Sequence, residues 1–231
     1  MKKTALVSGA NKGIGLEITR QLAQRAYRVF LTARNVQRGE AAAAALRKEG
    51  LDVEFIPLDV ADSTSIQAAR REIGSRCEGL TVLINNAGIL IDSNRNILAL
   101  SEAEIRNTMN INALGPLFLT QAFADLLVDG GRVVNVSSGG GAICGGASTW
   151  APIYCISKTT ENAITMQLAH ALADRQILVN AVCPGWVQTD MGGSGATRSI
   201  PEGADTPLWL ATAEGLRETG KFYRDRQIIS W

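Results

Sequence analysis

The chain has a single histidine, His170, and four cysteines without paired spacing. A serine hydrolase needs a general base, and His170 lies on a predicted helix that faces away from Ser138. The Ser137-Ser138 context also lacks the Gly-x-Ser-x-Gly elbow. The cysteines lack the spacing of a zinc or redox centre, so we expect no metal site and free thiols in a reducing cytoplasm at Cys77, Cys144, Cys155 and Cys183.

Neither an excess of charge nor a long hydrophobic run is present. The 23 Lys and Arg residues nearly balance the 22 Asp and Glu residues, which gives no reason to expect nucleic acid or an anionic membrane as a partner. No stretch approaches the roughly 20 apolar residues of a membrane helix. We therefore expect a cytoplasmic protein whose partners are small molecules or further copies of itself.

Short apolar, β-branched runs alternate with longer helical stretches. A hydrophobic content of 46% in 231 residues can supply the core of one domain spanning residues 1–231. Because the short runs are hydrophobic almost throughout, helices should cover both faces of their sheet. The sequence predicts a single-domain α/β fold with a doubly wound parallel sheet (Rossmann fold), and its strands are expected at 4–8, 28–33, 53–57, 81–85, 132–137 and 177–183.

Two predicted helices have more apolar surface than one face of a sheet requires, which indicates subunit contacts. They span 101–128, with Ser101 as N-cap and Glu104 completing a capping box, and 152–174. Residues 191–201 are rich in Gly, Ser and Thr, as in a mobile lid. Residues 139–146 contain five glycines, which predicts either a flexible loop beside the site or a tolerant surface loop.

A glycine-rich turn follows the first predicted strand and opens a helix. Gly9 permits a tight turn, Gly13 lets the backbone approach a pyrophosphate, and Gly15 allows close helix packing. The helix N-terminus adds unpaired amides and the positive end of the helix dipole. A plain structural turn is the alternative, but the strand-to-helix context favours a dinucleotide site.

The residues after the second strand indicate which dinucleotide is bound. An NAD-dependent enzyme is expected to have a carboxylate there, about 20 residues after the turn. This chain has Arg34, which attracts a 2′-phosphate, and Lys12 in the glycine turn can reach the same group. We therefore predict NADPH/NADP+ as the cofactor, although Arg34 alone is equally typical of a solvated surface. Asp59 and the turn at 85–88 are candidates for binding the adenosine part of the cofactor. The alternative is that each is a simple turn at the end of a strand.

Tyr154 and Lys158 are four residues apart at the start of a predicted helix, so both side chains project from one face. A free phenol titrates near pH ~10. An ammonium one turn away should lower the pKa of Tyr154 and make it an effective proton donor and acceptor. The spacing alone is a common accident, and the nucleotide signature elsewhere in the chain favours the catalytic interpretation.

With these residues in place, the chain resembles the short-chain dehydrogenase/reductase family along essentially its whole length. The matching positions beyond the glycine turn are Asp59, Asn85-Asn-Ala-Gly88, Asn112, Ser138, Tyr154-x-x-x-Lys158, Pro184-Gly185 and Thr189. Within the family, the NADPH-dependent carbonyl reductases are similar at Asn11-Lys12, at 184–191 and at Trp231.

The resemblance implies a role for each position. Tyr154 protonates the substrate oxygen, Lys158 lowers its pKa and holds the nicotinamide ribose, and Ser138 stabilises charge on the oxygen. Strand alternation turns only one of the two hydroxyls of Ser137 and Ser138 toward the site, and the family pattern matches the second, Ser138. Asn112 holds a water that links Lys158 to solvent; taken alone, Asn112 is more typical of an asparagine inside a helix that bonds to the backbone. The implied catalytic set is Asn112, Ser138, Tyr154 and Lys158; the implied cofactor set is Gly9, Asn11, Lys12, Gly13, Ile14, Gly15, Arg34, Asp59, Val60, Asn86, Ala87, Gly88, Tyr154, Lys158, Pro184, Gly185, Val187 and Thr189.

The implied activity is NADPH-dependent reduction of an aldehyde, ketone or diketone, as in a carbonyl reductase or alcohol dehydrogenase. The alternative is a non-catalytic NADPH-binding sensor of the same fold. Some monomeric carbonyl reductases have a long insertion between the catalytic serine and tyrosine, whereas only 15 residues separate Ser138 from Tyr154 here, which implies a homodimer or homotetramer. Trp150 and Trp186 either line an apolar substrate cleft or are buried.

Overall fold

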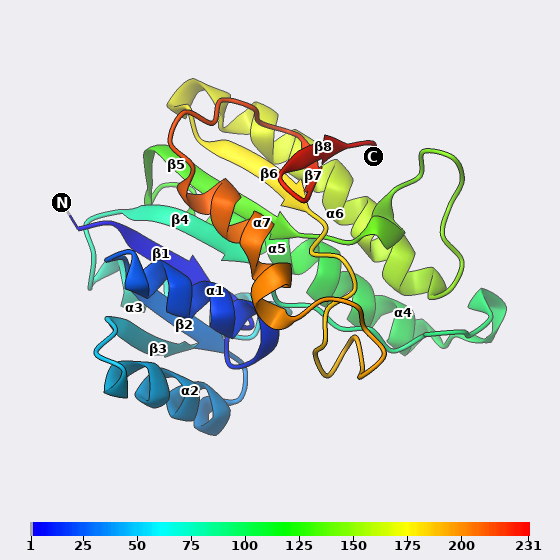
Figure 1. The fold of residues 1–231 in the computed structure, drawn as a ribbon, viewed down its shortest axis with the longest axis horizontal. Helices are drawn as coiled ribbons and strands as arrows, with labels where there is room; N and C mark the ends of the chain where they lie inside the picture. The colour runs from blue at the N-terminus through cyan, green and yellow to red at the C-terminus, as the bar shows by residue number, and fades with distance from the viewer. Residues whose placement is uncertain (1) are drawn as a thin grey trace.

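A computed structural model describes residues 2–231, which form one eight-stranded sheet with the order β3-β2-β1-β4-β5-β6-β7-β8 (Figure 1). Only the β7–β8 pair is antiparallel. The strand order reverses between β1 and β4, which is where a doubly wound sheet binds ligands. The predicted doubly wound α/β fold is confirmed, and its strands are β1 (Thr4–Val7), β2 (Arg28–Ala33), β3 (Val53–Pro57), β4 (Leu80–Asn85), β5 (Leu127–Val136), β6 (Leu178–Val182), β7 (Phe222–Arg224) and β8 (Gln227–Ile229).

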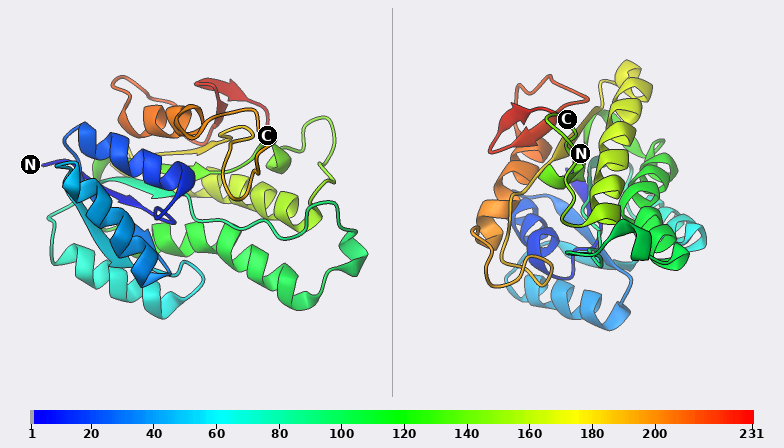
Figure 2. Two further views of the ribbon diagram at one scale, coloured as in Figure 1. Left: turned by 60° about the horizontal axis from the view of Figure 1, so that its bottom comes forward. Right: turned by 90° about the vertical axis from the view of Figure 1, so that its right-hand side faces the viewer.

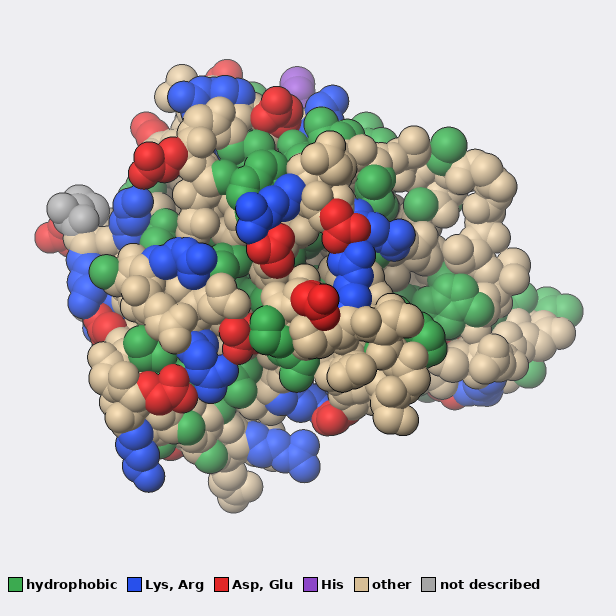
Figure 3. All heavy atoms as spheres, viewed as in Figure 1, with side chains coloured by type: hydrophobic (Ala, Val, Ile, Leu, Met, Phe, Trp, Pro, Cys, Tyr) green, Lys and Arg blue, Asp and Glu red, His purple; other side chains and the backbone are tan. Residues whose placement is uncertain are grey.

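Helices cover both faces of the sheet, and each face has its own hydrophobic cluster (Figure 2). One face packs against α1 (Gly13–Gln24), α2 (Val36–Lys48) and α7 (Ile200–Thr212). The other packs against α3 (Ser63–Gly74), α5 (Gly115–Phe123) and α6 (Pro152–Ala171). No helix within residues 2–231 is long and apolar enough to cross a membrane. On the face drawn in Figure 3, acidic and basic side chains are interspersed.

The predicted helix 101–128 is wrong beyond its first turns. Its capping box at Ser101 and Glu104 is present, but the segment divides into α4 (Glu102–Met109), a π-helical turn η2 (Asn110–Leu114) and α5. Pro116 has no amide hydrogen for the carbonyl four residues earlier, so the regular helical pattern cannot continue through it. The end of the segment belongs to β5, because Leu127 pairs with Leu80 in the sheet.

The glycine segment 139–146 is not flexible in its first part. Residues Gly139–Gly141 form a short 3-10 helix, η3, and both Gly140 and Gly141 are buried. A side-chain carbon at Gly141 would lie 2.6 Å from the backbone carbonyl carbon of Lys158, so glycine is required for this approach to α6. The first part of the segment is therefore a tightly packed support for the helix that carries Lys158, whereas residues 143–146 form an exposed loop.

Further boundaries differ from the predictions. β5 begins at Leu127 and not at residue 132. Helix α6 ends at Ala171, before a 3-10 turn η4 (Ala173–Arg175). The predicted lid 191–201 extends too far, because Ile200 already begins α7, whose N-cap is Ser199. The elements α7, β7 and β8 were not among the predicted strands and named helices; β7 and β8 are only three residues each, too short for a periodic signal.

Candidate active site

A cleft of about 720 Å³ opens at the carboxyl ends of the central strands, the side toward which the strand arrows of Figure 1 point. Its wall combines the glycine turn, the ends of β2 to β6 and the segment before α7. The predicted residues that line it are Gly9, Asn11, Lys12, Gly13, Ile14, Arg34, Asp59, Val60, Asn86, Ala87, Gly88, Tyr154, Lys158, Pro184 and Thr189. The predicted residues that lie outside its lining are Gly15, Asn112, Ser138, Gly185 and Val187.

The glycine turn has the geometry of a phosphate cradle. Gly9 and Gly13 have φ angles of +62° and +58°, which L side chains rarely adopt. A side-chain carbon at Gly9 would lie 2.8 Å from the Cα of Ala87. No side chain caps the N-terminus of α1, whereas Asn35 and Asp62 cap α2 and α3. The uncapped amides and the absence of side chains fit the pyrophosphate of a dinucleotide.

Asn86 ties the end of β4 to this turn. Its Nδ2 donates to the carbonyls of Ser8, at 2.9 Å, and Gly9, at 3.1 Å. Gly15 contributes by packing rather than by lining the cleft, because a side-chain carbon there would lie 2.4 Å from Nδ2 of Asn86. The third glycine thus has the close-packing role that its position predicts.

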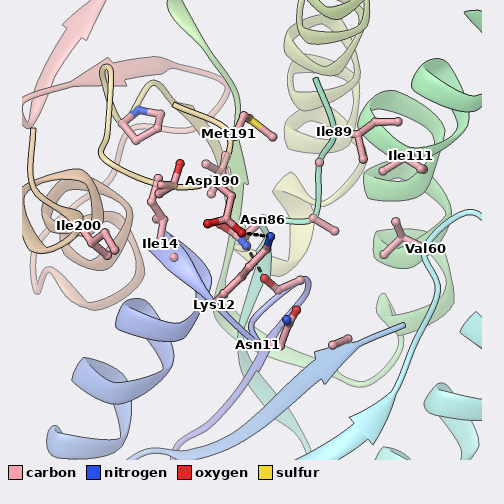
Figure 4. Close-up of a pocket in the computed structure, with 18 of the residues that line it drawn as sticks. Asn11, Lys12, Ile14, Val60, Asn86, Ile89, Ile111, Asp190, Met191 and Ile200 are labelled. Atoms are coloured by element: carbon pink, nitrogen blue, oxygen red, sulfur yellow. Dashed lines mark hydrogen bonds and ion pairs between the residues drawn. The ribbon is translucent and has the colours of Figure 1, made fainter. Parts of the chain in front are cut away.

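Basic side chains gather where a 2′-phosphate is expected. Arg34 is exposed and lines the cleft, while Arg38, in the first turn of α2, lines an adjoining hollow together with Lys12. Lys12 forms an ion pair with Asp190 (Figure 4). Neither arginine forms an ion pair within residues 2–231. The sequence interpretation missed Arg38 and Asp190, because Arg34 precedes the N-cap Asn35 and helical spacing does not relate it to Arg38.

Tyr154 and Lys158 lie together on the first turns of α6, both almost fully buried. The Nζ of Lys158 is 6.0 Å from the centre of the Tyr154 ring. Burial raises the pKa of Tyr154, while Lys158 and a hydrogen bond with Ser138 act in the opposite direction. Lys158 therefore has the expected effect, but the prediction of a lowered pKa is wrong for the phenol as a whole, because desolvation of the phenolate outweighs the ammonium.

The two adjacent serines have different environments. The hydroxyl of Ser137 donates to Oδ1 of Asn162 at 2.6 Å and is committed there. The hydroxyl of Ser138 accepts from the amide of Gly140 and also contacts Tyr154. The structure therefore brings Ser138, and not the hydroxyl of Ser137, to the phenol.

Asn112 lies in the π-helical turn η2, next to the cleft. Its Nδ2 donates to the Ile89 carbonyl at 2.8 Å and to Ser157 at 3.1 Å, and its Oδ1 accepts from the Ile89 amide at 2.8 Å. The side chain thus clamps the segment after Gly88. The water-holding role of Asn112 stays a prediction.

Asp92 was not predicted, and it holds the start of α6. Its Oδ2 accepts from the backbone amides of Ile153, at 2.6 Å, and Tyr154, at 3.4 Å. Ala151, the N-cap residue, has no side chain that could do this. Asp92 is fully buried, and the loop is also tied down by the Asn94 amide, which donates to the Trp150 carbonyl at 2.6 Å. A carboxylate from a distant loop therefore caps the helix that carries the phenol.

We expect Asp92→Ala to lower the free energy of unfolding by about 2 kcal/mol, because two buried amides lose a charged acceptor. Chemical denaturation measures this loss. Asp92→Asn is the matched control, since it keeps one acceptor oxygen and should cost clearly less. Equal stability of the wild type and Asp92→Ala would contradict the capping role.

The comparisons with known proteins agree with this geometry. A model of the short chain dehydrogenase family matches residues 3–198. The chain belongs to this family. It is 34% identical to NADPH carbonyl reductase 1 of Mus musculus over an alignment that covers 100% of this chain and 99% of the mouse protein. The Homo sapiens protein of the same name is also 34% identical, with 98% of each chain covered.

Solved structures of short-chain dehydrogenases superpose closely on this one. NADPH-bound carbonyl reductase from chicken fatty liver has a TM-score of 0.88 at 28% identity, covering 100% of this chain and 99% of the chicken chain. A landomycin C-6 ketoreductase with bound NADP and rabelomycin has a TM-score of 0.84 at 27% identity, covering 95% and 93%. The family resemblance expected from the sequence is confirmed.

Proposed function

We propose that this short-chain dehydrogenase uses NADPH to reduce the carbonyl group of a small aldehyde, ketone or diketone, with Tyr154 as proton donor. The observation that carries the proposal is the grouping of Tyr154, Lys158 and Ser138 beside a cleft that also contains the glycine turn. The basic residues near the glycine turn, and the NADPH carbonyl reductases at 34% identity, support the choice of cofactor and reaction. The free cysteines are consistent with a cytoplasmic location, which we also propose.

NADPH, when bound, supplies a hydride to the carbonyl carbon. The Tyr154 hydroxyl donates its proton to the carbonyl oxygen as negative charge develops there, and Ser138 stabilises the same oxygen. The pKa of Tyr154 is raised above the ordinary value of about 10, so the phenol is protonated at neutral pH and the donor is ready before the substrate arrives. Lys158 stabilises the phenolate that remains. Two of the three ammonium hydrogens of Lys158 are used within the chain, which leaves one for a ribose hydroxyl.

Apolar side chains near Tyr154 suggest the kind of substrate. The Trp150 ring lies 5.6 Å from the Tyr154 ring, and its side chain is 44% exposed. Trp186 is 55% exposed, so neither tryptophan is simply buried, and neither is among the residues that line the cleft. Ile89 and Met191 line the cleft itself (Figure 4). We propose a substrate that carries an apolar or aromatic group next to the reactive carbonyl.

A panel of aldehydes, ketones and diketones, assayed by oxidation of NADPH and of NADH, tests this function. Turnover with NADPH, strongest for aromatic carbonyls, supports it. Saturable NADPH binding without turnover of any carbonyl would instead support the sensor of the same fold. Absence of NADPH binding would contradict both functions.

We also propose that the chain forms a homodimer or homotetramer through α5 and α6, which contact each other on one side of the sheet. These helices expose large apolar side chains: Phe118 is 44% exposed, Ile156 43% and Met166 47%. A contact with a second copy of the chain would remove this apolar surface from water. We expect light scattering to give two or four times the mass of the chain. The double variant Phe118→Glu/Met166→Glu should give a monomer, and a monomeric wild type would contradict the proposal.

A further inference from the structure

Glu161 lies one helical turn after Lys158 on α6 and is 1% exposed. Its Oε2 accepts a hydrogen bond from the Lys158 ammonium at 2.8 Å. A second hydrogen of the same ammonium goes to the Val136 carbonyl, also at 2.8 Å. The lysine beside the phenol is therefore held between a carboxylate on its own helix and the last residue of β5.

No other charged side chain competes for this carboxylate. Within residues 2–231, Lys158 is its only ion-pair partner and the only charged group that influences its pKa. Asn112 from η2 and Ser137 after β5, both neutral, contact α6 on this side. The charged groups on other segments against α6 are engaged elsewhere: Asp92 accepts from the amides at the start of the helix, Glu102 pairs with Arg106, and Glu104 pairs with Arg95. The other titratable group that acts on Tyr154 is Cys183, after β6. Glu161 and Lys158 thus form a buried ion pair whose two charges both act on Tyr154.

The charge of Glu161 acts on both of its neighbours. Burial opposes the charge of Lys158, but Glu161 and Tyr154 together raise the pKa of the ammonium. On Tyr154, Glu161 opposes the effect of Lys158 and raises the pKa of the phenol. Burial raises the pKa of Glu161 itself to about 7, against the pull of Lys158. The phenol therefore experiences a lysine whose charge is partly balanced.

We propose that Glu161 is a positioning residue of the reaction: its carboxylate holds the Lys158 ammonium against the Val136 carbonyl and sets the net charge that Tyr154 experiences. This inference rests on the proposed function, because the phenol matters only where Tyr154 transfers a proton. A purely structural pair would affect folding stability and leave the ionisation of Tyr154 unchanged. The ionisation of the phenol is therefore the property that separates the two roles.

The first test is Glu161→Gln, which keeps the size and an acceptor oxygen and removes the charge. Losing a negative charge favours the phenolate, so the midpoint of Tyr154 ionisation should fall by roughly one pH unit. It is measured without cofactor from the ultraviolet absorbance of the phenolate, while circular dichroism follows the fold. The chain has three tyrosines, and subtracting the curve of Tyr154→Phe removes the other two.

The same shift should appear in alcohol oxidation with NADP+, which requires the phenolate and therefore gains activity as pH rises through the Tyr154 midpoint. Glu102→Gln is the matched control, because it removes one charge from an exposed ion pair with Arg106 on α4. We expect Glu102→Gln to titrate like the wild type. A midpoint in Glu161→Gln that is unchanged, or higher than in the wild type, overturns the inference.

A second measurement applies where Glu161→Gln does not fold. Carbon-13 NMR of the glutamate carboxyl groups follows Glu161 directly, and its signal is assigned by its loss in Glu161→Asp. In Lys158→Met the carboxylate loses its counter-ion, so the pKa of Glu161 should rise by roughly one unit or more. An unchanged pKa there shows that the two groups are not coupled and overturns the inference.

The outcomes for the inference and for the proposed function are separable. A shifted phenol midpoint in a protein that reduces no carbonyl leaves the coupling intact and contradicts the function. Carbonyl turnover with an unshifted midpoint keeps the function and contradicts the role of Glu161.

Discussion

Tyr154→Phe is expected to lower kcat/KM for NADPH-dependent carbonyl reduction by roughly 10²- to 10⁴-fold, the usual contribution of a positioned proton donor. The change removes one hydroxyl, which is the group that contacts Ser138 and faces the Lys158 charge. The aromatic ring and its packing near Trp150 remain. The loss should therefore appear in kcat with little change in the affinity for NADPH, which nicotinamide fluorescence measures.

Tyr27→Phe is the matched control for this change. Tyr27 is 5% exposed and lies in the core cluster beneath α1, outside the residues that line the cleft. It should keep wild-type turnover. Activity of Tyr154→Phe within tenfold of the wild type, in a protein that still binds NADPH, would show that another group supplies the proton.

The central strands could be predicted because strands that are buried on both faces consist of short, nearly continuous runs of apolar residues. β2 begins and ends at the predicted residues, and all but its first residue are buried. β3 also has the predicted bounds, although it is a partly buried edge strand. The helix predicted at 101–128 failed for the opposite reason. Pro116 interrupts the regular helix in the middle of the segment. The last residues are compatible with a helix, and only the pairing of Leu127 with Leu80 decides that the chain has already become a strand. Tertiary pairing here overrides local propensity.

The same distinction separates the predicted site residues from the missed ones. The glycine turn and the Tyr154–Lys158 pair are local patterns whose geometry follows from spacing. Asp92 caps a helix that begins 60 residues later, and the residues next to Asp92 in the sequence do not predict this contact. The spacing of three residues between Lys158 and Glu161 could have predicted an ion pair on one helix face. The burial of Glu161, which strengthens the effect of its charge on Lys158 and Tyr154, depends on the fold and could not be predicted from this spacing.

The second large effect is expected at the cofactor's 2′-phosphate. Arg34→Asp should lower kcat/KM with NADPH by roughly 100-fold, because it removes one charged hydrogen-bond donor and puts a carboxylate in its place. Activity with NADH should stay the same or improve, since a carboxylate at this strand end suits ribose hydroxyls. Steady-state kinetics with both cofactors measure the change in preference.

Arg34 should matter more than Lys12 for this preference. Lys12 is already paired with Asp190, so a phosphate has to compete for it, whereas Arg34 and Arg38 have no ion-pair partner within residues 2–231. Arg71→Asp on α3 is the matched control, because it makes the same charge change on an exposed helix outside the cleft. This control tests whether a change in net charge far from the cofactor is enough to alter the preference for NADPH. Salt screens distant charges, so Arg71→Asp should change the preference only slightly. An unaltered preference for NADPH in Arg34→Asp would place phosphate recognition at Arg38 and Lys12 instead.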